Sequence, residues 1–450
     1  MTTNSDNAGF SNRPLKLLVL VNLLARSGGT IRALQSIDYY HRIGYKLASF
    51  LDYLSYIWSV REGFKDVASV YRKYSILPIG YEKPVSLAHI AELSPKGRRW
   101  LYSVIGELLY RCNLSKKVLL VENYKPDIIV SFHEDLPYLR LTYELKTQLL
   151  APAITFLQLP PFYGESSREH NIEKACLLHK AVLSGGSWRS SMDILILESL
   201  LDTSTHNEDR REIEALLKSL DMVIAMSKAI AVEMKRIPKN LVYRDPGYTL
   251  DDNALDLVKK VKALNIPRGD YVVFIGRPMD CRKGLVEALI AFKYLLKEFP
   301  TLRLFVIGAV SPKFESSAYS FLRRCLRIDE SKVIFTGFLN REELYKLVKG
   351  ARLVLYPSHV DSFSFTVLES LMLETPVVAY RIPALEIYYG GVKKRGIWLV
   401  GEGDIGKFVG ASIEVLELWR KKDVEVKPPR IRSWDDIMRE EIELINRVLR

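Results

Sequence analysis

Short apolar blocks alternate with longer amphipathic stretches along most of the chain. In the first half, the apolar blocks lie at residues 15–21, 45–50, 127–130, 153–156 and 222–225. In the second half they lie at residues 271–275, 302–307, 333–335, 353–356 and 376–379, and a helical stretch at 285–299 follows the first of them. Short aliphatic blocks of this kind are typical of buried parallel strands. The pattern therefore predicts strand–helix units of a doubly wound α/β fold.

This alternation occurs twice, with a charged stretch between the two runs. Two Rossmann-like domains that face each other across an interdomain cleft are therefore expected, because open α/β sheets bind ligands beyond the carboxyl ends of their strands. The expected organisation is a disordered tail (1–14), an N-terminal domain (15–248), a linker (249–268), a C-terminal domain (269–415), and a helical segment (416–450) that crosses back to the N-terminal domain.

The first apolar block has two interpretations. Arg13 and Lys16 precede an apolar run, which imitates a secretory signal. Against this, the block is followed by Ser27-Gly28-Gly29-Thr30, a glycine turn that makes sense only if the block is a retained strand. We prefer the buried strand, with a turn at residues 27–30 and a helix over residues 31–42.

Charge and cysteine content narrow the class of protein. The net charge is +12, which fits nucleic acid, an anionic membrane surface or a phosphate-bearing ligand. The basic residues are dispersed and no nucleic-acid recognition motif occurs, so no nucleic-acid partner is expected. No apolar run approaches the ~18 residues that cross a bilayer. The four cysteines are far apart and form no CxxC pair, so neither a disulfide framework nor a zinc site is expected and a reducing cytosol fits best.

The most informative stretch spans residues 356–371. A strand is expected to end at Tyr356, a polar loop carries Asp361, and a helix begins near Phe365 with Glu369 one turn inside it. Loop amides and a helix N-terminus form a positive concavity suited to a diphosphate, and flanking carboxylates can accept hydrogen bonds from hydroxyls. The alternative is a pair of solvated acids beside an ordinary helix start.

A second motif opens the second run. Gly276-Arg277 ends its first strand, and Lys283-Gly284 follows at the start of the next helix. Arg277 and Lys283 can converge on one diphosphate, the arginine as a planar fork and the lysine as a point charge. The alternative is that both are surface cations at a helix start.

Together these motifs resemble those of the GT-B fold retaining glycosyltransferases of glycosyltransferase family 4 (glycosyl transferases group 1). The signature of that family is an acidic residue and a glutamate separated by seven residues, preceded by a GR…KG loop. Here the match is Asp361 and Glu369, after Gly276-Arg277 and Lys283-Gly284. The likeness runs in the family's order from about residue 15 to 440 and includes the glycine pair Gly28-Gly29, the segment 125–133 that ends at His133, and the segments 221–227, 335–337, 375–379 and 433–434.

The resemblance implies a role for each matched residue. The N-terminal domain would bind the acceptor and the C-terminal domain the nucleotide-sugar donor. Glu369 would hold the donor ribose, Asp361 would contact the donor sugar, and Arg277 with Lys283 would neutralise the departing diphosphate. The Gly28 and Gly29 amides would approach the same phosphates from across the cleft, and His133 would lie near the sugar. The remaining donor-binding residues would be Gly276, Ser362, Phe363 and Ser364. For His133 the alternative is a hydrogen-bonded histidine at a strand end.

Several positions depart from the family's pattern. Asp361 stands where the family usually has glutamate, and Ser362 and Ser364 stand where it has glycine. An aspartate is one methylene shorter, so the sugar contact would shift or use a water, and serine restricts a backbone that glycine leaves free. Glu374 also replaces a usual glycine. These changes keep open a second hypothesis, a catalytically impaired nucleotide-sugar-binding or scaffold protein of the same fold.

The expected reaction moves a sugar from a nucleotide-diphosphate donor to an acceptor hydroxyl with retention of anomeric configuration. No DxD-type motif stands in a convincing position, so we expect no metal and no cofactor. An epimerase or phosphorylase on the same fold is a further alternative. Basic and aromatic residues between 51 and 112, among them Arg72 and Lys73, suit either an anionic membrane surface with a lipid-linked glycan acceptor or the packing of a helical insertion. The expected location is cytoplasmic, with peripheral attachment to the inner face of the cell membrane as a hypothesis.

Overall fold

The computed structural model describes residues 13–21, 28–51, 73, 75–81, 121–183, 205–392, 396–421 and 423–450. Most of the expected N-terminal tail lies outside these ranges, as do Arg72 and most of the aromatic-rich stretch between residues 51 and 112. The predictions made for those segments therefore stay predictions.

The first half of the chain builds a seven-stranded sheet of order β3-β2-β1-β4-β5-β6-β7. Within this sheet, strand β1 pairs in parallel with β2 and β4. The strands are β1 (Lys16–Leu20), β2 (Lys46–Leu51), β3 (Ile76–Tyr81), β4 (Ile128–Ser131), β5 (Ala153–Leu157), β6 (Met222–Ala225) and β7 (Leu241–Tyr243). The apolar block near the start of the chain is thus a buried strand of the sheet, as preferred from the sequence.

The helices that the structure describes in this half of the chain are α1 (Gly28–Arg42), α5 (Leu136–Leu149), α6 (Ser166–Leu183), α8 (Thr205–Ser219) and α9 (Lys228–Met234). Helix α1 begins at Gly28 and not at Ile31, so the predicted turn at residues 27–30 is wrong for Gly28, Gly29 and Thr30. Both glycines therefore lie in the first turn of a helix, where the backbone N–H groups lack intrahelical acceptors.

The second half builds a six-stranded sheet of order β10-β9-β8-β11-β12-β13, in which every neighbouring pair is parallel. Its strands are β8 (Tyr271–Ile275), β9 (Arg303–Ile307), β10 (Val333–Gly337), β11 (Leu353–Tyr356), β12 (Val377–Tyr380) and β13 (Ile397–Val400). Strands β11 and β12 are buried along their whole length, as expected for a parallel sheet covered on both faces.

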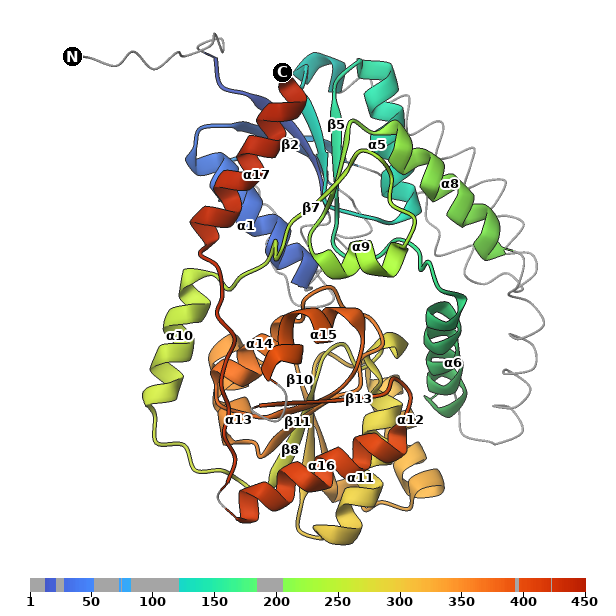
Figure 1. Cartoon of the computed structure of the whole chain (residues 1–450), viewed down its shortest axis with the longest axis vertical. Coiled ribbons are helices and arrows are strands. Elements are labelled where there is room, and N and C mark those ends of the chain that lie inside the picture. Colours follow the sequence, from blue (N-terminus) through green and yellow to red (C-terminus); the bar gives the residue numbers. More distant parts are fainter. Residues whose placement is uncertain are drawn as a thin grey trace. The chain divides into compact units, whose positions relative to one another are not determined.

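The helices of the second half are α10 (Asp252–Ala263), α11 (Leu285–Glu298), α12 (Pro312–Phe321), α13 (Arg341–Gly350), α14 (Phe365–Met372), α15 (Pro383–Tyr389), α16 (Ile405–Arg420) and α17 (Trp434–Leu449), with a short 3₁₀ turn, η2 (Cys281–Lys283), before α11. Helices α11 and α16 pack against each other below the strands of the second sheet in Figure 1. Among the described residues, none of the helices is both long and apolar enough to cross a membrane.

The chain forms two compact units. Unit 1 comprises Met1–Phe156, Leu216–Val223 and Met438–Arg450, and unit 2 comprises Leu157–Ala215 and Ile224–Ile437. Most of α17 thus belongs to unit 1, where the Glu441 carboxylate accepts hydrogen bonds from Arg32 and Tyr40 of α1. Helix α6, although it comes from the first half of the chain, belongs to unit 2, where it packs on η2 and lies beside α12 (Figure 1).

Candidate functional site

The donor residues predicted in the second half of the chain lie at or next to the point where the strand order of the second sheet reverses. Strands β8 and β11 are neighbours at the centre of this sheet, and the chain leaves them in opposite directions, toward β9 and β12. Such a switch point is where doubly wound sheets bind ligands. The two loops concerned are residues 276–284, called the β8 loop, and residues 357–364, called the β11 loop.

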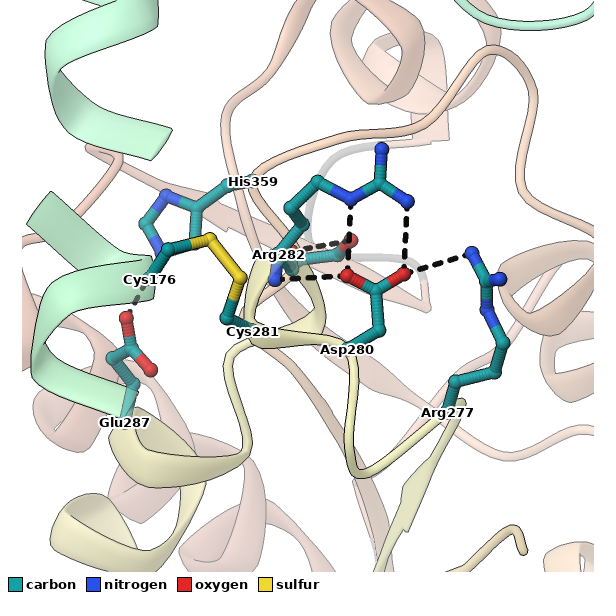
Figure 2. Close-up of a disulfide and its surroundings, with 8 residues drawn as sticks. Cys176, Arg277, Asp280, Cys281, Arg282, Glu287 and His359 are labelled. Carbon is teal, nitrogen blue, oxygen red and sulfur yellow. Dashed lines mark hydrogen bonds and ion pairs between the residues drawn. A yellow bond between two sulfur atoms is a disulfide. The ribbon is translucent and has the colours of Figure 1, made fainter. Parts of the chain in front are cut away.

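In the β8 loop, one carboxylate collects the charges of two arginines. Asp280 accepts two hydrogen bonds from the Arg282 guanidinium, each of 3.0 Å, and lies 2.8 Å from Nη2 of Arg277, as Figure 2 shows. Although burial opposes ionisation, the Arg282 hydrogen bonds and the charges of Arg277, Arg282 and Lys283 lower the pKa of Asp280 to about 2. Arg277 is therefore held at the loop while its side chain stays 54% exposed.

The two loops contact each other directly. Nζ of Lys283 donates to the Val360 carbonyl at 3.0 Å and lies 3.6 Å from the Asp361 carboxylate. Gly284 adopts a φ of +75°, and a Cβ there would lie 2.0 Å from the Pro357 carbonyl oxygen, so only glycine fits. The lysine of the GR…KG motif thus joins the two loops, and its glycine permits their close approach.

The backbone amides of the β11 loop donate hydrogen bonds to a carboxylate of the same loop. Oδ1 of Asp361 accepts from the backbone N–H groups of Ser362 at 2.9 Å, Phe363 at 3.4 Å and Ser364 at 3.0 Å, and Tyr356 donates its hydroxyl to Oδ2. The amides that the sequence assigned to a diphosphate are therefore already bonded to Asp361. A ligand that takes these amides must displace this carboxylate.

The serines that replace the family's glycines lie in this loop. Ser364 is in the left-handed region with φ +69°, where glycine is unstrained, and its hydroxyl caps α14 at the N–H of Val367. Ser362 donates its hydroxyl to that of Tyr248 at 3.0 Å. Phe363 is buried, with its ring stacked on Tyr248 at 5.6 Å. The Phe363 side chain is thus part of the core, and only its backbone N–H is among the amides that donate to Asp361.

Glu369 and Gly276 also lie in unit 2. The partly buried Glu369 carboxylate accepts a 2.6 Å hydrogen bond from Tyr345, and burial raises its pKa above the ordinary value. At Gly276 an added Cβ would meet only ordinary contacts, the nearest being Cβ of Lys283 at 3.7 Å. The fold itself therefore does not require glycine at position 276, which is consistent with a position kept open for a ligand.

The predicted residues of the first half lie in unit 1. His133 follows β4, and its ring lies 4.2 Å from that of Tyr138. Burial lowers the pKa of His133 to about 4, so the ring is neutral at pH 7. Gly28 and Gly29 start α1. The roles of these three residues toward the donor remain predictions.

A disulfide corrects one expectation from the sequence. Cys176 of α6 is bonded to Cys281 of η2, 105 residues later, within the β8 loop (Figure 2). The expectation of no disulfide was wrong, because residues far apart in the chain meet where α6 packs on η2. The argument for a reducing compartment, which rested on cysteine spacing, loses this support.

Sequence reasoning missed several residues that lie in the two loops or contact them. Asp280 and Arg282 lie inside the GR…KG segment, and His359 lies two residues before Asp361, so their place in the motifs was a signal for all three. Arg168 of α6 gave no such signal, yet it donates to the His359 carbonyl at 2.8 Å. Among the residues that the structure describes, no group of three or more His, Cys, Asp or Glu side chains is placed to hold a metal ion.

Residues 269–418 match the family described as Glycosyl transferases group 1. The chain is 31% identical over 183 residues to an uncharacterized glycosyltransferase of Methanocaldococcus jannaschii, a match that covers 38% of this chain and 43% of that protein. It is also 31% identical over 138 residues to a D-inositol 3-phosphate glycosyltransferase of Acidothermus cellulolyticus, covering 29% of this chain and 30% of that protein. The chain thus spans less than half the length of either curated relative.

Solved structures resemble nearly the whole chain. HepE of Anabaena, in complex with UDP-glucose, has a TM-score of 0.59 at 14% identity and covers 96% of this chain and 100% of its own. Sucrose-phosphate synthase from Thermosynechococcus elongatus has a TM-score of 0.60 at 14% identity and covers 97% of this chain and 99% of its own. At this identity the likeness shows the fold alone. The chain therefore has the two-domain, Rossmann-like α/β architecture of the GT-B fold, and its second half matches glycosyl transferases of group 1.

Proposed function

We propose that this protein is a glycosyltransferase that moves a sugar from a nucleotide-diphosphate donor to an acceptor hydroxyl. The observation that carries the proposal is the contact between the β8 and β11 loops, where Lys283 links the cationic segment to the Asp361 segment. The group 1 match over residues 269–418 includes both loops. The relatives named glycosyltransferases support the same reaction class, and the UDP-glucose bound to HepE supports a nucleotide-sugar donor.

The residues of the two loops suit departure of a nucleotide diphosphate. As the donor bond breaks, negative charge grows on the leaving group, and Arg277 with Lys283 would stabilise it. The Arg277–Asp280 ion pair holds the guanidinium in place before donor binds, so less reorganisation is needed at the reactive moment. Because these cations supply positive charge, we propose a reaction that needs neither metal nor cofactor. Unchanged turnover in excess EDTA is the expected result, and strict dependence on added manganese or magnesium would refute it.

Retention of anomeric configuration is the finer part of the proposal. In it, the acceptor attacks the face that the leaving group vacates, and a leaving-group phosphate oxygen takes the acceptor proton. Neutral His133 would contact the sugar as a hydrogen-bonding partner. The test is the anomeric configuration of the product by NMR, and an inverted product would overturn this assignment.

The proposal extends to the acceptor and to the location of the protein in the cell. A lipid-linked glycan acceptor and peripheral attachment to the inner face of the cell membrane suit the net charge of +12. The expected result is sedimentation with anionic liposomes at low salt and release as salt rises, because screening shortens from ~30 Å at 0.01 M to ~3 Å at 1 M. Equal recovery with neutral and anionic liposomes would contradict the attachment.

A donor-binding scaffold without turnover is the second candidate. It is favoured by one observation, the occupation of the β11-loop amides by Asp361 itself. Calorimetric titration with a panel of nucleotide sugars, beginning with UDP-glucose, combined with a nucleotide-release assay, separates the two. Donor binding followed by nucleotide release supports the enzyme. Donor binding with no nucleotide release, whether in the presence of any acceptor or in water alone, supports the scaffold.

A further inference from the structure

His359 of the β11 loop lies buried between two carboxylates. Its Nδ1 is 2.8 Å from Oε1 of Glu402, and its Nε2 is 2.9 Å from Oε1 of Glu287, while the side chain is only 3% exposed. An ionised carboxylate only accepts hydrogen bonds, so a ring that faces two of them must donate from both nitrogens. The geometry therefore points to a doubly protonated, cationic imidazolium ring.

Arg168 of α6 extends this cluster to a second cation. Its Nε and Nη2 donate to Glu233 at 3.1 and 2.9 Å, its Nη1 donates to Glu402, and its Nη2 also donates to the His359 carbonyl. With His359 protonated, two cations face the three carboxylates of Glu233, Glu287 and Glu402. Loss of the His359 proton would leave three buried negative charges against one positive charge.

Other ionisable groups lie near the cluster, but they are neutral and do not supply the positive charge that the protonated His359 ring provides. The ring of Tyr380, on β12, lies 5.1 Å from that of His359, and the Tyr163 ring lies 5.7 Å from the Arg168 guanidinium. Burial raises the pKa of both tyrosines, which therefore stay neutral at pH 9. His179 of α6 is also near Glu287, but burial lowers its pKa, so it is neutral where His359 is charged.

The backbone of the β11 loop joins this cluster to the donor site. The His359 N–H donates to the Arg282 carbonyl of the β8 loop at 2.9 Å. The next residue, Val360, supplies the carbonyl that accepts from Lys283, and Asp361 follows. Movement of the His359 ring out of its carboxylate pair would thus shift the acceptor of Lys283 and the start of the Asp361 turn.

We propose that protonated His359, together with Arg168, is a positioning group for binding of the nucleotide-diphosphate donor, because it holds the β11 loop where the Val360 carbonyl accepts from Lys283. This inference rests on the proposed function. It also gives α6, a helix from the first half of the chain, a role in donor binding at the second sheet.

The sign of the pH dependence follows from the two carboxylates. Burial opposes the charged ring, but the hydrogen bonds to Glu287 and Glu402 outweigh it and raise the pKa of His359 to about 8. A raised pKa means that the interaction is complete below the ordinary histidine value of about 6.5 and is lost as pH rises through the folded value. The β11 loop is therefore expected to lose this placement against Lys283, and with it donor affinity, above pH 8.

The experiment combines histidine ¹⁵N NMR on the full chain with calorimetric titration by UDP, GDP, ADP and dTDP at pH 7 and pH 9. We expect one histidine to titrate near pH 8 and to lose that titration in His359→Gln. If binding needs the protonated ring, the dissociation constant of the bound nucleotide should rise about tenfold between pH 7 and pH 9, since about a tenth of the protein keeps the proton.

Glu287→Gln is the decisive variant, because it preserves shape and removes one charge. Its carboxamide can donate to a neutral ring nitrogen, so the ring satisfies both partners without the extra proton. Nucleotide affinity in Glu287→Gln should be equal at pH 7 and pH 9. The matched control is Glu417→Gln on α16, where the carboxylate is solvent-accessible and pairs with Arg420. This control should keep the tenfold change, which shows that loss of any one carboxylate is not enough to remove it.

The outcomes separate this inference from the proposed function. If His359 titrates near pH 8 but the wild-type dissociation constant of the bound nucleotide is equal at pH 7 and pH 9, the positioning role is wrong while the donor site stands. If Glu287→Gln keeps the tenfold change, another group is responsible and the inference is again overturned. If none of the four nucleotides binds at pH 7, the proposed function fails and the inference fails with it.

Discussion

The two loops at the centre of the second sheet differ in what they leave available to a ligand. In the β8 loop, Arg277 is fixed by Asp280 yet remains 54% exposed, so its charge can still meet an incoming phosphate. In the β11 loop, the amides are bonded to Asp361, and the Phe363 side chain is buried. The comparison teaches that the first loop presents its charge in advance, whereas the second must exchange an internal hydrogen-bond partner for the ligand.

Gly284→Ala should have the largest effect, because it breaks the contact between the loops. A Cβ at 2.0 Å from the Pro357 oxygen, in a left-handed backbone, should lower the free energy of unfolding by about 3 kcal/mol or more. Urea unfolding measures this. The control is Gly276→Ala, which has space and should change stability by less than about 0.5 kcal/mol while weakening donor binding. Equal stability losses in the two variants would contradict the assigned close approach.

Removal of the disulfide tests the anchoring of the β8 loop alone. Cys176→Ser opens a link between residues 105 apart, so the free energy of unfolding should fall by about 2–4 kcal/mol. Urea unfolding with and without reductant measures the loss. Cys325→Ser removes an exposed free thiol and should change nothing. Stability of Cys176→Ser that matches the wild type would show that α6 packing holds the loop without the bond.

Glu369→Ala should weaken donor binding by about ten- to a hundredfold, the range expected when a hydrogen bond to a charged group is lost. Because Glu369 also accepts from Tyr345, part of any stability change belongs to that pair. Tyr345→Phe keeps the carboxylate and serves as the control, with donor affinity close to that of the wild type. Full donor affinity in Glu369→Ala would remove the ribose assignment.

Ser364→Gly should have the smallest effect and the opposite sign. It removes the strain of a serine in the left-handed region, which costs about 1 kcal/mol of stability. Replacing the serine N-cap by glycine loses only about a few tenths of a kcal/mol. Thermal unfolding should show a stabilised protein. Ser364→Ala keeps the strain and loses the cap, so it should be destabilised by about 1 kcal/mol. Destabilisation of Ser364→Gly would mean that the serine hydroxyl does more than cap α14.

The sequence predicted those elements whose pattern of apolar residues is local and continuous. Strands β6, β8 and β11 begin and end at the predicted residues, because continuous apolar blocks mark buried parallel strands. Strands β3, β7 and β13 were not predicted. Strand β7 is three residues long and only partly buried, which leaves little pattern to read.

In the site, the loops and their order were predictable, but their partners were not. The strand–loop–helix pattern located Asp361 and Lys283, yet Arg168 and Cys176 come from a helix more than a hundred residues earlier. No local period encodes where such a helix packs. The bonding of Asp361 to its own amides could have been anticipated, because a short aspartate side chain readily bonds to the backbone just after it.

The most direct test of the central claim is the kinetic effect of Arg277→Ala, with Arg327→Ala, a substitution outside both loops, as the control. If Arg277 meets charge that grows as the donor bond breaks, its removal should lower kcat for nucleotide release by about a hundredfold or more, and donor affinity should fall less. Lys283→Arg should also be poorly active, since a planar fork cannot replace a compact ammonium. An Arg277→Ala variant that binds donor weakly but turns over at the wild-type rate once saturated would contradict the account.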